Sequence, residues 1–139
     1  MMNETRQRTL GILKPDCVKR KLMGKVIERL ETEGFTFVNG KIKHLSREEA
    51  EGFYAVHKER AFFPELIDFM TSGPAFVMHL ERENAVLKLR EVIGATDPEE
   101  AAPGTIRREW AENKQNNLIH ASDSQETAGI EAEYFFGSS

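Results

Sequence analysis

The sequence contains one cysteine, Cys17, among 139 residues, which excludes an intramolecular disulfide and a metal site built from paired cysteines. Residues 1–8 hold no apolar stretch of the kind that a secretory signal needs. The longest apolar runs are about five residues, far below the ~20 that span a membrane. These absences predict a protein of a reducing compartment, and we expect it in the cytoplasm, away from membranes.

An excess of positive charge is also absent. Lys and Arg number 19 against 23 Asp and Glu, which gives a net charge of −4. Proteins that neutralise many phosphates of a long nucleic acid are usually basic, so we expect no specific nucleic-acid partner. A small anionic ligand needs only a few local cations and stays possible. Hydrophobic residues at 40% and charged residues at 30% are typical of one globular domain, expected here over residues 1–139.

Two nucleotide-binding signatures are missing, because the sequence has neither a GxxxxGK[S/T] loop nor a GxGxxG turn. His, Cys, Asp and Glu do not cluster at the spacings of a protein metal site either. A nucleotide enzyme of this sequence therefore has to hold phosphates with side chains and a helix N-terminus. Any Mg²⁺ would then ride on the nucleotide phosphates, with no ligand taken directly from the protein.

Short apolar runs and hydrophobic periods predict strands and helices in turn. In chain order they are a strand at 9–13, a helix from residue 18 that Gly34 ends, a strand at 35–42, a helix from a capping box at 46–49, a short helix after 62–64, a strand at 75–80, a helix at 86–93, a strand at 117–120, and a helix from a second capping box at 122–125 through Phe136. Residues 94–115 show no period, so we expect a long loop there. Without the helix pair at 46–70, the order is β-α-β-β-α-β. It predicts an α+β, ferredoxin-like antiparallel sheet with helices on it and a long loop before the last strand.

His120 is the first candidate for chemistry, at the end of an expected strand and directly before a helix start. A single histidine is most often structural. Here Ser122 and Ser124 supply hydroxyls next to it, and the free N–H groups of the following helix favour a phosphate. A neutral imidazole is a competent nucleophile near pH 7, so His120 is a candidate nucleophile for phosphate chemistry.

Glu131 lies on the helix that follows, at the border of its apolar stripe with Thr127 and Phe135. It is either a surface acid at the edge of that stripe or a carboxylate that points inward. An inward carboxylate needs a partner. A hydrogen bond to one ring nitrogen of His120 would fix its tautomer and leave the other nitrogen's lone pair free, the orientation that a histidine nucleophile requires.

Three cationic side chains and one aromatic side chain are candidates for binding a ligand. Lys14 directly follows the first strand, and Arg90 and Arg107 enclose Thr96 in the sequence. Each of these charges alone is most often a solvated surface group. Together the arginines could form a fork that binds a polyphosphate. Phe62 could pack in the core or stack on a nucleobase.

Six stretches together resemble the nucleoside diphosphate kinase family along nearly the whole chain. They are residues 9–16, which end in Lys-Pro-Asp, Tyr54 with 60–63 (Arg-Ala-Phe-Phe), 70–74 (Met-Thr-Ser-Gly-Pro), 94–98 (Gly-Ala-Thr-Asp-Pro), 103–107 (Pro-Gly-Thr-Ile-Arg) and 117–124 (Asn-Leu-Ile-His-Ala-Ser-Asp-Ser). Six ordered matches are implausible by chance, and the last is very specific. The length resembles that of the short bacterial members.

The resemblance implies an enzyme that moves the γ-phosphate of a nucleoside triphosphate, typically ATP, to a nucleoside diphosphate with Mg²⁺. It implies a ping-pong mechanism through a phosphohistidine at His120, with Glu131 and Ser122 holding the ring. It also implies nucleotide contacts, namely those of Lys14, Tyr54, His57, Phe62, Arg90, Thr96, Arg107 and Asn117. Members of the family are homo-oligomers, tetramers or hexamers built from dimers.

The family pattern gives these residues separate tasks. Lys14 and Asn117 would bind sugar hydroxyls and nearby phosphate oxygens, and Tyr54 would support the site beside Lys14. His57 matches a position near the α-phosphate. Phe62 would stack on the base, and because every base has a π-face, stacking implies a broad range of nucleosides.

The sequence departs from the family pattern at three positions. Ala121 and Cys17 stand where glycine is usual, and Lys114 stands where an apolar residue usually covers the other face of the base. Two alternative functions remain. One is a catalytically silent relative, which the match at every functional position disfavours. The other is an RNA-recognition module of the same strand order, which the acidic charge and the lack of an aromatic-rich strand disfavour.

Overall fold

The computed structural model describes residues 6–114 and 116–137, and its strands form one antiparallel sheet in the order β2-β3-β1-β4. The strands are β1 (Arg6–Leu13), β2 (Thr36–Lys43), β3 (Ala75–Glu83) and β4 (Ile119–Ala121). β1 pairs with both β3 and β4, so it lies inside the sheet next to the short last strand. This order is the ferredoxin-like arrangement that the sequence predicts, and the fold class is confirmed.

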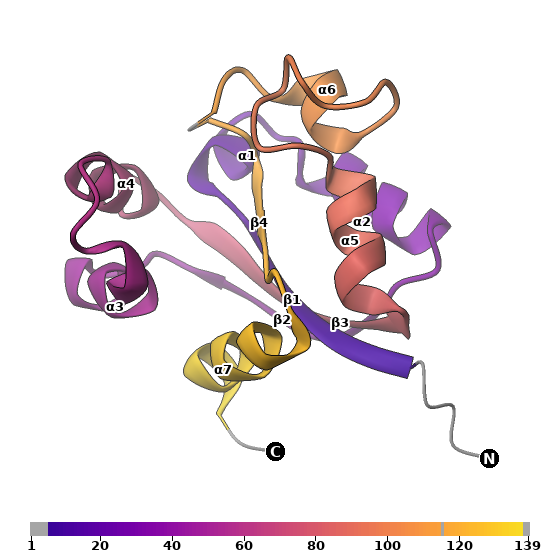
Figure 1. Cartoon of the computed structure of the whole chain (residues 1–139), viewed down its shortest axis with the longest axis horizontal. Helices are drawn as coiled ribbons and strands as arrows, with labels where there is room; N and C mark the ends of the chain where they lie inside the picture. The colour runs from indigo at the N-terminus through magenta and orange to yellow at the C-terminus, as the bar shows by residue number, and fades with distance from the viewer. Residues whose placement is uncertain (1–5, 115, 138–139) are drawn as a thin grey trace.

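Helices cover both faces of the sheet (Figure 1). They are α1 (Pro15–Lys19), α2 (Met23–Thr32), α3 (Arg47–Phe53), the 3₁₀ turn η1 (Ala55–His57), α4 (Phe63–Met70), α5 (Ala85–Ile93), α6 (Ile106–Trp110) and α7 (Gln125–Phe136). No helix within the described ranges is long and apolar enough to cross a membrane.

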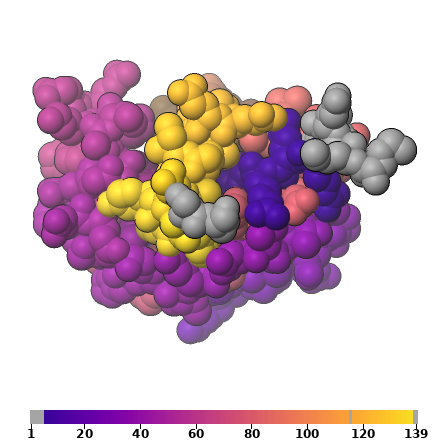
Figure 2. Space-filling model, turned by 90° about the horizontal axis from the view of Figure 1, so that it is seen from below, coloured from indigo at the N-terminus to yellow at the C-terminus, as the bar shows by residue number. Residues whose placement is uncertain are grey.

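Two apolar clusters hold these layers together, one on each face of the sheet. One joins α2 and α5 to the sheet, with Val26 and Leu89 fully buried. The other joins α3, α4 and α7 to the opposite face, where Ile67 is fully buried. β1 contributes to both clusters because successive side chains of a strand point to opposite faces. In Figure 2, α7 (yellow) lies at the surface beside β1 (indigo).

The helix expected from residue 18 is wrong as a single element. The chain forms α1 and then α2, and between them Lys21 takes a positive φ of 61°. Lysine favours this conformation little, so no local signal marks the break. The turn is closed by the Leu22 N–H, which donates to Cys17 O at 3.0 Å. It allows both Cys17 and Leu22 to be buried in the same cluster, a gain of tertiary packing that outweighs local preference.

The expected long loop contains a short helix, α6, and so is only partly irregular. Thr105 caps α6 by accepting a hydrogen bond from the Arg108 N–H at 3.3 Å. Gly94 ends α5 as predicted, with a positive φ of 93°. Gln115, at the end of the expected loop, lies outside the described residues. Five residues of helix are too few to show a hydrophobic period, which explains the miss.

The last two elements are shifted from their expected bounds. β4 pairs with β1 only over Ile119–Ala121, so Asn117 and Leu118 precede the strand. The capping box expected at 122–125 is wrong, because Ser124 is the N-cap and accepts from Thr127 N at 3.0 Å. The capping box of Ser46 and Glu49, by contrast, is confirmed.

Candidate active site

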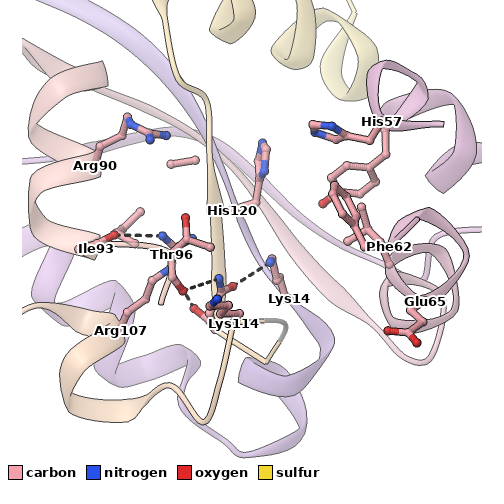
Figure 3. Close-up of a pocket in the computed structure, with 15 residues that line it drawn as sticks. Lys14, His57, Phe62, Glu65, Arg90, Ile93, Thr96, Arg107, Lys114 and His120 are labelled. Carbon is pink, nitrogen blue, oxygen red and sulfur yellow. Dashed lines mark hydrogen bonds between the residues drawn. The ribbon is translucent and has the colours of Figure 1, made fainter. Parts of the chain in front are cut away.

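A pocket of about 710 Å³ opens beside β1 and β4, between the α3–α4 region and the segment from α5 to α6. Its lining contains nine of the eleven predicted site residues, namely Lys14, Tyr54, His57, Phe62, Arg90, Thr96, Arg107, Asn117 and His120. Figure 3 shows the His120 ring between Arg90 on one side and His57 on the other. The fold therefore brings side chains from across the whole sequence to one cavity.

The remaining two predicted residues, Glu131 and Ser122, lie behind His120. The Nε2 atom of His120 is 2.9 Å from Glu131 Oε1, and Ser122 Oγ donates to the same oxygen at 2.6 Å. Ser122 is buried and its backbone N–H donates to Leu10 O, which fixes it to β1. Of the two readings of Glu131, the inward one is therefore the observed one: its side chain is only 14% exposed.

This arrangement decides which nitrogen of His120 carries the proton. A carboxylate only accepts hydrogen bonds, so the Nε2–H of His120 must donate to Glu131. In the neutral ring, Nδ1 is then unprotonated. Phe53 and Tyr54 meet the ring edge-on, with centroids at 5.3 and 6.0 Å, and so restrict its rotation. His120 is thus a held imidazole with a free lone pair, which is the form that can act as a nucleophile.

Lys14 and Asn117 form the next part of the lining. Lys14 Nζ donates to Asn117 Oδ1 at 2.8 Å, and Asn117 Nδ2 donates to Thr96 O at 3.2 Å (dashed in Figure 3). Burial, followed by the nearby charge of Arg107, lowers the pKa of Lys14 from 10.5 to about 8, against a smaller opposing effect of Asp16. A lysine in this state binds an incoming anion well, because the anion relieves the cost of its burial.

Arg107 serves a second task that the sequence did not predict. Its guanidinium donates to three backbone carbonyls, those of Gly94 at 3.0 Å, Asn117 at 3.3 Å and Ile119 at 2.6 Å. Since a guanidinium has five N–H donors, about two remain for a ligand. Burial and the charge of Arg90 lower the pKa of Arg107 to about 10. Arg107 therefore braces the segment from α5 to β4 and still faces the pocket.

A strained turn precedes His120 and was not predicted. Leu118 has a positive φ of 75°, and the Ile119 N–H donates to Asn117 O across it at 2.9 Å, which makes a γ-turn. Asp16 Oδ2 accepts from the Leu118 N–H at 3.2 Å and holds this turn. Burial raises the pKa of Asp16. The aspartate of the Lys-Pro-Asp stretch thus positions the strand that carries His120.

The opposite wall is aromatic. Phe62 is 49% exposed at the start of α4, and its ring contacts His57 at a centroid distance of 5.5 Å. Tyr54 is buried, and its hydroxyl has no hydrogen-bond partner within the part of the chain that the structure describes. Burial, with the Glu131 carboxylate second, raises the pKa of Tyr54, so its hydroxyl stays neutral. Tyr54 does not bond Lys14 here; it supports the His120 ring.

Sequence reasoning assigned no role in the site to four residues that line the pocket: Glu65, Leu66, Ile93 and Gly94. Lys114 and Ala121, which the resemblance marked as departures from the family pattern, also line it. Phe53, which contacts His120, was expected only as a helix-face residue. Periodicity places Leu66 and Ile93 on helices but does not say which cavity those helices border. For Gly94, which the sequence marks only as the end of a helix, no local signal gives its position in the pocket.

The donor set of the pocket suits a polyphosphate. Four cationic side chains line the cavity with His120, namely Lys14, Arg90, Arg107 and the more exposed Lys114. Among residues 6–114 and 116–137, no group of three or more His, Cys, Asp or Glu side chains is placed to hold a metal ion.

Comparison with known proteins agrees with this geometry. A family model described as "Nucleoside diphosphate kinase" matches residues 7–139. The nucleoside diphosphate kinase of Thiobacillus denitrificans is 54% identical over 133 residues, which is 96% of this chain and 94% of the relative. Among solved structures, the nucleoside diphosphate kinase of Aquifex aeolicus matches with a TM-score of 0.92 and 45% identity, over 94% of this chain and 95% of that one. A halophilic nucleoside diphosphate kinase of Halobacterium salinarum, solved in complex with CDP, gives a TM-score of 0.91 and 41% identity, over 95% and 88% of the two chains.

Proposed function

The chain belongs to the nucleoside diphosphate kinase family, and we propose that it transfers the γ-phosphate of a nucleoside triphosphate to a nucleoside diphosphate in two half-reactions through a phosphohistidine at His120. The observation that carries this proposal is the contact between His120 Nε2 and Glu131 Oε1. It leaves Nδ1 unprotonated on a ring that lines a pocket with cationic side chains. A second protein base is not needed, because the nucleophile already carries its lone pair.

In the first half-reaction, His120 Nδ1 attacks the γ-phosphorus. An N–P bond forms while the bond from the γ-phosphorus to the bridging oxygen breaks, and the electron pair leaves with the nucleoside diphosphate. In the second, an oxygen of the acceptor diphosphate attacks the phosphohistidine, and the N–P electron pair returns to Nδ1. Glu131 keeps the Nε2 proton in place throughout, so the ring holds its tautomer across both steps.

The phosphates are bound by the cations around His120. Lys14, Arg90 and Arg107 neutralise the chain of phosphates, which is the main requirement of phosphoryl-transfer catalysis. Lys14 and Asn117 bind the sugar hydroxyls and nearby phosphate oxygens, Thr96 binds the phosphates with the arginines, and His57 lies toward the α-phosphate; all of these residues line the pocket. The nucleotide enters with Mg²⁺ on its phosphates, as a Mg²⁺–nucleotide substrate.

The base lies at the mouth of the pocket, stacked on Phe62. The exposure of this ring supports the proposal, since a core phenylalanine would be buried. Stacking alone accepts all bases, so we expect the substrates to include nucleotides of every common base. The CDP bound by the halophilic relative is in keeping with a pyrimidine nucleotide in this site.

We also propose a homo-oligomer, a tetramer or a hexamer built from dimers. β2 is an edge strand of the sheet, and it exposes Val38 and Ile42 to 38% and 64%. An open edge with apolar side chains favours pairing with another chain. Light scattering coupled to size-exclusion chromatography measures the state, and a single-chain mass of 15.8 kDa would refute this part of the proposal.

The proposed function is tested by labelling the protein with ATP that carries radioactive γ-phosphate. We expect an acid-labile, alkali-stable label that leaves as a labelled triphosphate when CDP or GDP is added. His120→Ala should take up no label, whereas His44→Ala, a surface histidine whose Nε2 is 2.8 Å from Thr71 O, serves as the matched control. A label retained by His120→Ala would refute the nucleophile. A wild-type protein that binds nucleotides without any label would instead be the silent relative.

A further inference from the structure

The short helix α6 depends on the rest of the fold for its position. It has five residues, Ile106–Trp110, and isolated helices shorter than about 12–15 residues are marginal in water. It nevertheless carries Arg107, one of the cationic residues that line the pocket. Ile106 is fully buried and anchors the start of the helix, but a single buried side chain does not fix the direction of the helix axis. Further contacts must do so.

Two arginines from the α1–α2 segment donate to the backbone at the two ends of α6. Arg29 Nη1 donates to Gly104 O at 2.6 Å, two residues before the helix begins. Arg20 Nη1 donates to Trp110 O at 2.7 Å, at the last residue of the helix. These contacts span 75 and 90 residues of sequence. In Figure 1, α6 (orange) lies above α1 and α2. We call Arg20 and Arg29 together the α6 clamp.

Both carbonyls are places where a cation has a structural effect. The last carbonyls of a helix have no partner inside it and carry a partial negative charge, so the Arg20 guanidinium stabilises the end of α6. At the other end, Gly104 has a positive φ of 86°, and Thr105 follows it as the N-cap of α6. The bond from Arg29 therefore fixes the peptide group that sets the direction in which the chain enters the helix.

Arg29 is itself held in place by a network that also includes α5. Its Nε donates to Glu33 Oε2 at 2.9 Å, and Lys88 Nζ of α5 lies 3.6 Å from Glu33 Oε1. The backbone oxygen of Glu33 accepts from Arg82 Nε at 2.6 Å, which ties the end of α2 to β3. Lys88 precedes Arg90 by two residues on α5. The network thus connects the two helices that carry the pocket arginines.

The position of α6 matters for binding because Arg107 has few donors to spare. Three of its hydrogen bonds go to backbone carbonyls of the segment from α5 to β4, so only its remaining donors face a ligand. A shift of α6 would turn these donors away from the phosphates. Donors that are already ordered bind an anion more tightly than mobile ones, because binding then costs less conformational entropy.

We propose that Arg20 and Arg29 are positioning residues for phosphate binding, which hold α6 so that the Arg107 guanidinium is ordered toward the pocket before a nucleotide arrives. The residues that line the pocket in the described part of the chain include neither of them, so the clamp acts through Arg107 and does not touch the ligand. The inference rests on the proposed function, because it needs the phosphates of a nucleotide at Arg107.

The test is a double-mutant cycle between the α6 clamp and Arg107, with the affinity for Mg²⁺-ADP measured by calorimetry. Methionine keeps most of the length of arginine and removes its donors. In the otherwise wild-type protein, Arg29→Met and Arg20→Met should each lower the affinity about three- to tenfold. In an Arg107→Met background, each should lower it less than about twofold, because the donors that the clamp positions are gone.

Lysine variants and a surface arginine complete the experiment. Arg29→Lys and Arg20→Lys keep one donor for each carbonyl and should recover part of the lost affinity. Arg47→Met is the matched control, because Arg47 Nη1 donates to the exposed Asp68 carboxylate at 2.8 Å and contacts no part of the segment from α5 to β4 in the described structure. It should keep the wild-type affinity in both backgrounds.

Three results would overturn the inference. They are wild-type ADP affinity in both Arg20→Met and Arg29→Met, a loss of the same size with and without Arg107, and the same loss in Arg47→Met. The first, with a lowered Tm, would mean that the arginines stabilise the fold alone. Failure of the proposed function has a different signature, which is the absence of a phosphohistidine label on a wild-type protein whose ADP affinity still shows the coupling between Arg29 and Arg107.

Discussion

Ser122 Oγ and His120 Nε2 meet at the same carboxylate oxygen, Glu131 Oε1, at 2.6 and 2.9 Å. His120 lies in β4 and Ser122 directly follows it, whereas Glu131 comes from the middle of α7. One oxygen therefore fixes both the ring of His120 and the turn into α7. The imidazole is positioned by a partly buried carboxylate oxygen that accepts two hydrogen bonds, which preorganises the ring before any nucleotide arrives.

Glu131→Gln should separate catalysis from binding. The amide can still accept from His120 Nε2, but it no longer carries the charge that stabilises the ring as phosphate is transferred. We expect the rate of phosphohistidine formation to fall on the order of 10²-fold, with nucleotide affinity nearly unchanged. Rapid-quench labelling and calorimetry measure the two. Glu126→Gln, exposed in the first turn of α7, is the control. If affinity collapsed instead, Glu131 would belong to the binding set or to the fold.

The pKa of Lys14, about 8, predicts a break in the pH dependence of the reaction. Phosphate binding needs the ammonium, so kcat/KM should fall as pH rises above about 8, since this ratio reports groups of the free enzyme. Lys14→Arg should lose the break, because a guanidinium stays charged in this range. A break that persists in this variant would assign the titration to another group.

The same shift predicts the sign of a stability change. In the unfolded chain Lys14 has its ordinary pKa of 10.5, so between pH 8 and 10.5 the unfolded state holds one more proton than the folded state. The free energy of unfolding of the ligand-free protein should therefore rise with pH across this window, relative to that of Lys14→Met. Urea titrations at pH 7.5 and 9.5 measure this difference, and a fall would contradict the assignment.

Gly94→Ala should destabilise the protein and disturb the pocket. A Cβ at this position would lie 2.6 Å from Thr105 Oγ1, and the backbone has a φ of 93°. We expect a loss of about 2–4 kcal/mol in the free energy of unfolding. Gly129→Ala is the matched control, because its Cβ meets nothing within 4 Å on α7. That change should stabilise by about 0.5–1 kcal/mol. Equal effects of the two substitutions would refute the steric argument.

Tyr54→Phe should have opposite effects on stability and on nucleotide binding. The buried hydroxyl of Tyr54 has no partner in the described part of the ligand-free protein, so its removal should raise the free energy of unfolding by up to about 1 kcal/mol. If the hydroxyl donates to a bound nucleotide, the shift in Tm caused by saturating Mg²⁺-ADP should shrink in the variant. An undiminished shift would leave Tyr54 with the role of packing His120 alone.

Much of the sheet and the helices follows from the sequence. β1 and β3 carry short apolar runs and α5 carries a helical apolar period, and their positions are confirmed. The break at Lys21 and the short α6 could not be predicted, because neither has a local period or a local conformational preference. The stretch around His120 predicted only Asn117, His120 and Ser122 of the site, and the γ-turn at Leu118 that precedes His120 depends on Asp16, 102 residues away.

The order of strands and helices along the chain was set by the sequence itself, since hydrophobic pattern is a local property, and the resemblance of six stretches to the family named the predicted site residues. Only the tertiary structure decided that Glu131 points inward, that Arg107 binds backbone carbonyls as well as facing the cavity, and that Lys114 lines it with an exposed side chain. These outcomes depend on hydrogen bonds between groups that are far apart in the sequence. Buried polar atoms have to be hydrogen-bonded, and only the tertiary structure determines which partner lies within reach.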